Sequence, residues 1–389
     1  MGKKNQKPAC IYGAVYMLKQ VNRLESEITG ALVSDDIEHV HRLRVASRRL
    51  RNGLGLFRDC LSPKIYKTYQ KHIRRITKAL GKARDLDIQI ECVTQQHGLL
   101  LDANLKPGYE RLLLRLKQER TKAQQKVVGA LNHLQGNQIL ETMRSHLELM
   151  AFTARNTHLY TPSLYKKSLK AIGDRLDDFL SYEVYIHQPE HIEKLHAMRI
   201  SGKHLRYTME IFAPIYDDAL LPFVRYMKEI QDQLGEIHDA DVWLDWLQKF
   251  IRKEQKRIED YFGDSKPLKE LLPGFEDLIE NRRNARELEY QSFLAAWTHF
   301  QQENVWAKLR EILQTSFNFD PDLSPISSDQ DKINTQFIEI KPEGETPFRI
   351  ENPDETPFTT AVHEPPNPIE NESSDRKTNQ NPHENRPDL

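Results

Sequence analysis

Two short segments of the chain carry cationic side chains at spacings that could hold an anion. In the first segment they recur every three or four residues: His41, Arg44, Arg48 and Arg51. The second segment repeats the pattern further along the chain: His196, Arg199, Lys203 and Arg206. At about 100° per residue, each set falls on one face of an α-helix. Like charges on one helix face repel each other, so each row implies an anion, either a ligand or an acidic partner helix.

The two rows belong to an internal duplication of the sequence. Residues 40–51 align without gaps on residues 195–206. A second motif follows each copy at matched spacing, with residues 80–87 aligning on residues 234–241. Two motifs that recur in the same order predict two similar helical units, which we expect a pseudo-two-fold axis to relate.

A stripe of mainly apolar residues lies beside each cationic row in the helical projection. In the first copy the stripe consists of Leu43, Ala46, Leu50, Leu54 and Phe57. In the second copy the matching positions hold Met198, Ser201, Leu205, Met209 and Phe212. Because the stripes follow the helical period, we expect them to face the core.

Five more cations fall within roughly a 100° arc of the next predicted helix: Lys71, Arg74, Arg75, Lys78 and Lys82. The matching positions of the second half are Arg225, Lys228, Glu229, Asp232 and Glu236. Only the first two of these are cations. We therefore expect the first half to hold more of an anionic ligand than the second.

Each second motif ends in a pair of carboxylates that chemistry could use: Asp85 and Asp87, then Asp239 and Asp241. The pair His238-Asp239 is similar to the metal-binding pair of HD phosphohydrolases, but the first copy has Arg84 where His238 stands. We favour helix caps or groups that orient arginines over catalytic or metal-binding roles. We expect no catalytic residue, metal or cofactor, and a metal-dependent phosphohydrolase acting on polyphosphate or nucleotides remains the alternative.

The surrounding sequence, from about residue 9 to residue 315, has the period of helices and no strand alternation. Breaks fall near Ser34, Ser62-Pro63, Lys106-Pro107, Gln135-Gly136, Thr161-Pro162, Gln188-Pro189, Asp217 and Lys266-Pro267. One last long helix is expected over residues 274–313. The predicted fold is all-α, with duplicated antiparallel helical bundles in the halves 9–160 and 161–317 of a domain spanning residues 1–317.

The composition changes in residues 318–389, which hold 11 of the 20 prolines and 16 Asp and Glu against 6 Lys and Arg. The rest of the chain has 50 Lys and Arg against 41 Asp and Glu. A segment with the composition of residues 318–389 buries too little apolar surface to order itself, so we expect a disordered acidic tail there. Its repeated Thr-Pro-Phe triplet could dock a protein partner, although a solvated tail is the favoured interpretation.

The three cysteines, Cys10, Cys60 and Cys92, are odd in number and lack CxxC spacing. Reduced thiols in a cytosolic protein are the simplest interpretation. No segment is apolar enough to span a membrane, and the N-terminus lacks the features of a secretory leader. We expect a cytoplasmic protein without a membrane partner.

The paired motifs resemble those of the CHAD family, the conserved histidine α-helical domain, over roughly residues 9–315. The family is characterised by a duplicated helical unit with a His-x-x-Arg helix and a later Gly-x-x-Arg/His-Asp-x-Asp turn. The resemblance implies two helical bundles around a basic central cavity. It also implies binding of inorganic polyphosphate and, in some members, localisation to polyphosphate granules. The triphosphatase domain that many relatives carry is not implied, because its Glu-x-Glu-x-Lys strand is missing here.

By position, the resemblance implies that the two cationic rows bind the anion, supported by Lys71, Arg74, Arg75, Lys78 and Lys228. Arg49 and His204, aligned with each other beside the rows, complete the candidate set. The second copy departs from the first at Ala197, His204 and Gly202, which puts the strength of its site in doubt. His41 and His196 could also be buried structural histidines.

A polyphosphate suits these residues because guanidinium groups bind phosphate oxygens in bidentate fashion and lysine acts as a point charge. Single-stranded nucleic-acid binders usually present regularly spaced aromatic platforms, and the motifs have none. We therefore expect no nucleic-acid partner, although a helical nucleic-acid or protein scaffold is a further alternative. Tyr207 and Tyr226 are expected to pack or to form hydrogen bonds.

Overall fold

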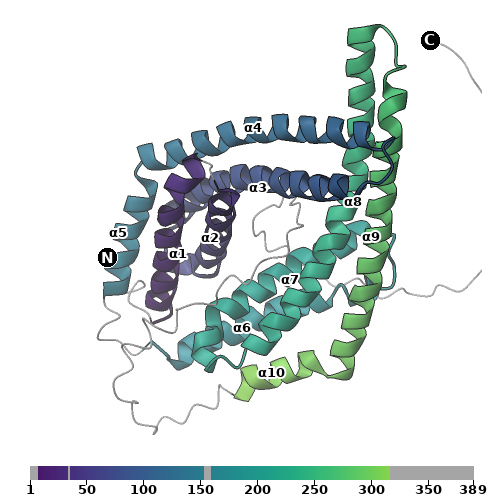
Figure 1. The fold of residues 1–389 in the computed structure, drawn as a ribbon. Helices are drawn as coiled ribbons and strands as arrows, with labels where there is room; N and C mark the ends of the chain where they lie inside the picture. Colours follow the sequence, from purple (N-terminus) through teal and green to yellow (C-terminus); the bar gives the residue numbers. More distant parts are fainter. Residues whose placement is uncertain (1–7, 34–35, 153–158, 316–389) are drawn as a thin grey trace, which may run out of the picture. The chain divides into compact units, whose positions relative to one another are not determined.

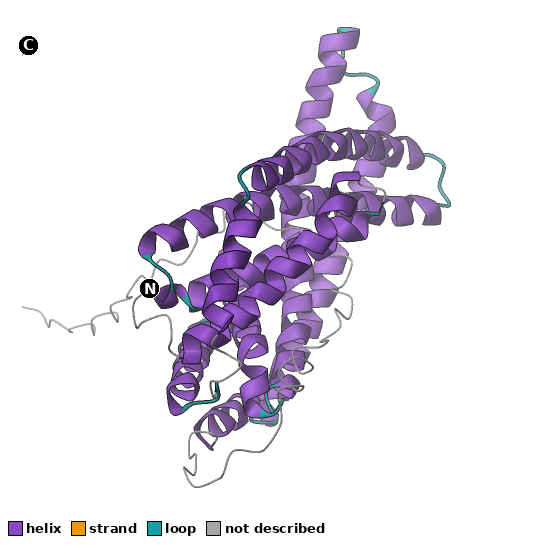
Figure 2. Cartoon of the chain, turned by 90° about the vertical axis from the view of Figure 1, so that its left-hand side faces the viewer, coloured by secondary structure: helices purple, strands orange, loops and turns teal. Residues whose placement is uncertain are grey.

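The computed structural model describes residues 8–33, 36–152 and 159–315. The helices within these ranges all lie in one compact unit, and the described residues include no strand (Figure 2). The fold is therefore all-α, as the sequence period predicts. The predicted tail, residues 318–389, falls outside the described residues.

Ten α-helices follow one another along the described ranges (Figure 1). The first five are α1 (Pro8–Val33), α2 (Ile37–Leu56), α3 (Pro63–Leu99), α4 (Lys106–Gly136) and α5 (Ile139–Ala151). The next five are α6 (Pro162–Leu180), α7 (Ile192–Phe212), α8 (Leu221–Phe262), α9 (Leu268–Gln302) and α10 (Val305–Thr315). The cationic rows lie on α2 and α7, and the second motifs lie on α3 and α8.

Helices α3 and α6 begin at residues whose side chains suit a first turn. The hydroxyl of Ser62 accepts a hydrogen bond from the Ile65 amide at 3.3 Å, and Pro63 follows in the first turn of α3. Thr161 caps α6 in the same way, with Pro162 next. Capping oxygens of this kind satisfy amides that have no partner within the helix. The breaks predicted at Ser62-Pro63 and Thr161-Pro162 are confirmed.

The expectation of one last helix over residues 274–313 is wrong. The chain instead forms α9, which begins at Leu268 and ends at Gln302, and the separate helix α10. Asn304 stands between them in the left-handed region, with φ of 53°. Asparagine tolerates this conformation better than most residues, so it allows a break that the apolar period does not reveal.

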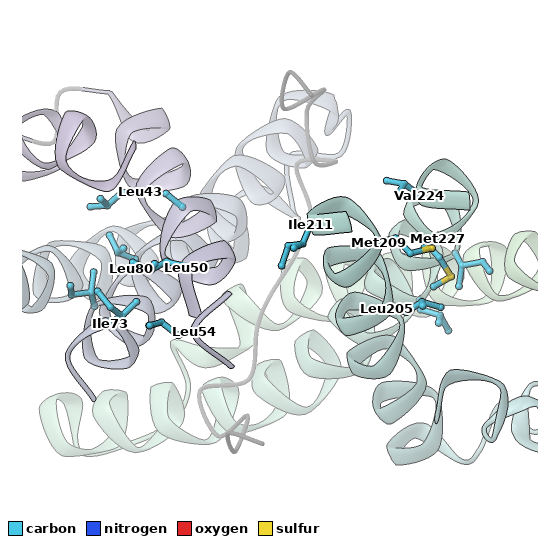
Figure 3. Close-up of a cluster of buried hydrophobic side chains, with 14 of the residues drawn as sticks. Leu43, Leu50, Leu54, Ile73, Leu80, Leu205, Met209, Ile211, Val224 and Met227 are labelled. Carbon is cyan, nitrogen blue, oxygen red and sulfur yellow. The ribbon is translucent and has the colours of Figure 1, made fainter. Parts of the chain in front are cut away.

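The apolar stripes pack as predicted, in two groups (Figure 3). Leu43, Leu50 and Leu54 on α2 pack with residues of α3, and all three are fully buried. Leu205 and Met209 on α7 lie near residues of α8 and are also fully buried. Each cationic row is thus carried by a helix whose adjacent face is fixed in the core.

The two sets of five helices meet through helices that occupy the same place in each set. Helix α4 contacts α9, α2 contacts α7, and α1 contacts α6. The paired positions Phe57 and Phe212 lie with ring centroids 6.2 Å apart. Contacts between equivalent elements are what a two-fold relation requires. The axis itself and the central basic cavity remain predictions.

The expectation of three reduced thiols is wrong for two of them. Cys10 at the start of α1 and Cys60, in the short 3-10 helix η2 (Arg58–Cys60), form a disulfide, with Cα atoms 5.4 Å apart. Cys92 is free and buried. Sequence spacing gave no sign of the pair, because the packing of α1 against α2 brings together residues 50 positions apart.

Among the described residues, no helix combines the length and the apolar character that crossing a membrane requires.

Candidate anion-binding site

The first cationic row lies on α2 and is largely withdrawn from solvent. Arg44 is 2% exposed and His41 is 9% exposed. Three neighbours are half-buried: Arg48, Arg49 and Arg51. The guanidinium of Arg44 lies over Gly81 of α3, where an added Cβ would sit 3.8 Å from Arg44 Nε. A Cβ at residue 81 would thus be in ordinary van der Waals contact with this arginine.

The second row, on α7, is still more deeply buried. Arg199, Lys203 and Arg206 are all buried, and His196 and His204 are half-buried. Gln231 of α8 accepts a hydrogen bond from Arg206 Nε at 3.0 Å and donates one to the carbonyl of Gly202 at 2.9 Å. Gln231 therefore orients Arg206, a role that the sequence interpretation did not assign.

The two rows meet at a single aromatic ring. The guanidinium carbon of Arg48, on α2, lies 5.4 Å from the centroid of Tyr207, and that of Arg206, on α7, lies 4.9 Å from it. Both distances are within the range of a cation–π interaction. Tyr207 is expected from the sequence to pack or to form hydrogen bonds, and in the structure it also contacts one arginine from each row. The rows therefore converge, as a shared anion would require.

One carboxylate joins the rows at the same place. Glu210 Oε2 lies 3.3 Å from Arg49 Nη2, and Glu210 Oε1 lies 3.3 Å from Arg206 Nη1. The side chain of Glu210 is only 7% exposed. The aligned position in the first copy is Gly55, so a comparison of the two copies could have singled out Glu210. The rows are thus neutralised in part by the protein itself.

The start of the second row faces the other motif of its half. His196 stacks on His238 with ring centroids 3.9 Å apart. Arg199 Nη2 lies 3.9 Å from Asp239 Oδ1, and the side chain of Arg199 makes no hydrogen bond to any described group. A buried guanidinium without close partners is costly, so this position favours an additional anion.

The cations predicted on α3 are more exposed than those of the two rows. The α3 face consists of Lys71, Arg74, Arg75 and Lys78, all of them exposed. No carboxylate among the described residues lies within 4.0 Å of these four side chains. On α8 the aligned positions include Glu229 and Asp232, and Lys228 is half-buried. The α3 face therefore has the stronger positive charge of the two, and the stronger binding expected of the first half remains a prediction.

The four aspartates of the second motifs lie inside α3 and α8, so the predicted turn and the helix-capping role are wrong. Asp87 Oδ1 accepts a hydrogen bond from Arg120 Nε of α4 at 2.5 Å. Asp241 Oδ1 accepts one from Arg286 Nε of α9, also at 2.5 Å. These two aspartates do orient arginines, but arginines that tie neighbouring helices together rather than those of the rows. Asp85 is buried.

Burial raises the pKa of Asp87, and the hydrogen bond and charge of Arg120 offset this only in part. Burial raises the pKa of Asp241 in the same way, against Arg286. Two equivalent ion pairs with equivalent electrostatics indicate a structural role repeated in each half. In residues 8–33, 36–152 and 159–315, no group of three or more His, Cys, Asp or Glu residues is placed to hold a metal ion.

Two solved structures have a fold similar to that of this chain. The crystal structure of the CHAD domain from the plant Ricinus communis superposes with a TM-score of 0.54 at 20% sequence identity, covering 75% of this chain and 91% of that chain. PptA from Streptomyces chartreusis superposes with a TM-score of 0.51 at 16% identity, covering 74% of this chain and 98% of that chain. At these identities the likeness concerns the fold alone.

No curated protein matches the sequence. The sequence of residues 15–248 does, however, match the CHAD domain family. That range contains both cationic rows and both second motifs. The chain therefore belongs to the CHAD domain family.

Proposed function

We propose that this protein binds inorganic polyphosphate, without hydrolysing it, through the rows on α2 and α7 and the exposed face of α3. The convergence of Arg48 and Arg206 on Tyr207 is the observation that carries the proposal, because it brings cations from both halves to one place. Family membership supports it. We further propose that binding takes place in the cytoplasm, where it could bring the protein to polyphosphate granules.

The chemistry of the polymer fits cations distributed in this way. Each internal phosphate carries about one negative charge and several acceptor oxygens, which arginine binds in bidentate fashion. A long chain can contact the exposed α3 face and the buried rows together, and many weak contacts add up along it. Lys71, Arg74, Arg75 and Lys78 would then guide the polymer electrostatically toward the rows.

A direct test replaces these four α3 residues together by glutamine and titrates the full chain with long-chain polyphosphate. Affinity should fall about tenfold or more, and the dependence of the binding constant on salt should become shallower, because fewer counterions are released. The matched control replaces four exposed lysines that lie in α8, in α9 and in the loop between these two helices: Lys253, Lys256, Lys266 and Lys269. Equal losses in both variants would show only a general effect of net charge and would contradict the proposal.

The absence of catalysis is tested separately. We expect no release of phosphate from polyphosphate or nucleotides with added Mg²⁺ or Mn²⁺. Release that Asp239→Ala abolishes would instead favour a hydrolase acting through the His238-Asp239 pair. Asp241→Asn is the control, since Asp241 binds Arg286 rather than the rows.

A further inference from the structure

The carboxylate of Glu210 occupies a position that a phosphate group would suit. It lies 3.3 Å from a guanidinium nitrogen of Arg49 on α2 and 3.3 Å from one of Arg206 on α7. Arg206 also lies against Tyr207, together with Arg48. A single acidic side chain thus binds one arginine from each half, at the point where the rows converge.

We infer that Glu210 is a built-in competitor for the anion and makes the site select long polyphosphate chains over short phosphates. The inference rests on the proposed function and concerns the same site. Glu210 holds Arg49 and Arg206 when no ligand is bound, and an incoming phosphate must share or displace this carboxylate. Because Glu210 is attached to the protein, it competes at a high effective concentration.

The cost of this competition depends on the length of the ligand. A short phosphate reaches only a few cations, so the loss of Arg49 and Arg206 removes a large share of its contacts. A long chain also reaches the α3 face and gives up only a small share. The buried negative charge additionally repels a nearby phosphate, an effect that the low local dielectric strengthens. Glu210 therefore penalises short anions more than long ones.

The duplication supports a specific role for this residue. The two copies align from residues 40–51 to Phe57 and Phe212, and Gly55 is the residue aligned with Glu210. The carboxylate is therefore a feature of one copy and not part of the repeated helical unit. A residue needed only to build the unit would be expected in both copies.

The test measures the binding of tripolyphosphate and long-chain polyphosphate to the full chain and to Glu210→Gln. The substitution keeps the shape and removes the charge. Affinity for tripolyphosphate should rise about tenfold and affinity for the long chain about two- to threefold, so that discrimination by length falls. Glu193→Gln removes an exposed charge from the same helix and should leave both affinities unchanged.

Stability separates this role from that of a simple clamp. Without ligand, Glu210→Gln should melt at a lower temperature, because the half-buried Arg49 and the buried Arg206 lose a carboxylate, and tripolyphosphate should raise its Tm more than that of the unmodified protein. A lower Tm with unchanged affinities and unchanged discrimination would overturn the inference. If Glu210→Gln does not fold, Glu210→Asp, which withdraws the charge by one methylene, should raise tripolyphosphate affinity about threefold, and no change would overturn the inference.

The result for the unmodified protein distinguishes the two proposals. If it binds neither tripolyphosphate nor long-chain polyphosphate, both the proposed function and the inference are wrong. If it binds long chains and Glu210→Gln leaves the preference for length intact, only the inference is wrong.

Discussion

Glu254 is the most enclosed acidic side chain among the described residues, and it connects α8 to α4. Its carboxylate is fully buried and accepts hydrogen bonds from Arg111, from two nitrogens of Arg115, and from Arg257. Burial alone would raise the pKa of Glu254, but the hydrogen bonds from Arg115 and Arg257 and the nearby positive charges outweigh it and lower the pKa. The ionised carboxylate therefore stabilises the fold.

Replacing Glu254 by glutamine should lower the free energy of unfolding by about 3 kcal/mol at neutral pH, because three arginines that converge on this buried carboxylate lose its charge. A carboxyl whose pKa is lowered by folding stabilises the protein above its unfolded pKa, and this contribution is lost as the pH falls through the folded pKa. The difference between the two proteins should therefore shrink on acidification. Thermal unfolding across the acid range measures it, with Glu259→Gln, exposed on the same helix, as the control. A pH-independent difference would contradict this account.

At the scale of single residues, the sequence predicts positions better than partners. The helical spacing of His41, Arg44, Arg48 and Arg51 places them together on one helix, as the structure shows, because that periodicity is local. The contacts of Tyr207 and Glu210 depend on how α2 and α7 meet, which no local pattern specifies. The disulfide between Cys10 and Cys60 was missed for the same reason. The roles of the candidate residues in binding remain predictions.

Helices α4 and α9 approach each other through two glycines that occupy matching places. A Cβ added to Gly108 would clash with the carbonyl oxygen of Leu271 and would lie 2.9 Å from Gly274 Cα. A Cβ added to Gly274 would lie 3.0 Å from Gly108 Cα and would clash with the carbonyl oxygen of Leu105. Both obstacles are backbone atoms, which cannot move aside as a flexible side chain does.

Gly108→Ala and Gly274→Ala should each lower the free energy of unfolding by about 2 kcal/mol, since α4 and α9 must separate to admit a methyl group. Gly129→Ala is the matched control, because Gly129 also lies in α4 but has no atom within 4 Å of an added Cβ. This control should raise stability by about 0.5–1 kcal/mol through the helix propensity of alanine. Denaturant unfolding of the three variants decides the matter, and similar values for all of them would refute the close contact.

At the scale of helices, the sequence predicts starts well and interruptions poorly. Ser62-Pro63 and Thr161-Pro162 mark true helix starts, because capping chemistry is local and specific. The break at Asn304 was missed, since the apolar period continues across it. The second motifs were predicted to form turns, but Gly81 and Gly235 lie inside α3 and α8. Helix α3 continues through Gly81, which lies beside Arg44.

The charge of the whole chain is divided unevenly along the sequence. Residues 318–389 carry 16 acidic and 6 basic residues, and the remainder carries 50 basic and 41 acidic residues. A tethered acidic segment can compete with an anionic ligand for a basic surface. Deleting residues 318–389 should therefore raise the affinity for polyphosphate roughly fivefold at low salt, with a smaller gain at high salt, where charges are screened.

The tail prediction is checked by titrating both proteins at two salt concentrations, after the helical circular dichroism signal has confirmed that the shortened chain folds. A deletion that brings no gain in affinity at low salt would rule out competition by the tail.

At the scale of the whole molecule, the duplication is the feature of the sequence that predicts most of the helix arrangement. Because the two motifs recur in order, one local pattern read twice predicts the paired helices α2 with α3 and α7 with α8. Contacts between helices of different halves, such as α4 with α9, depend on the packing of entire helices, which the local patterns do not predict. The same holds for the placement of the two rows against each other.

The central claim is that the basic rows are built for a flexible inorganic polyanion and not for nucleic acid. The most direct measurement is competition: long-chain polyphosphate bound to the full chain is challenged with single-stranded RNA at equal phosphate concentration and fixed salt. The account predicts that RNA leaves most of the polyphosphate bound, because the two cationic motifs lack regularly spaced aromatic platforms on which its bases could stack. Displacement by RNA as effective as that by unlabelled polyphosphate would contradict it.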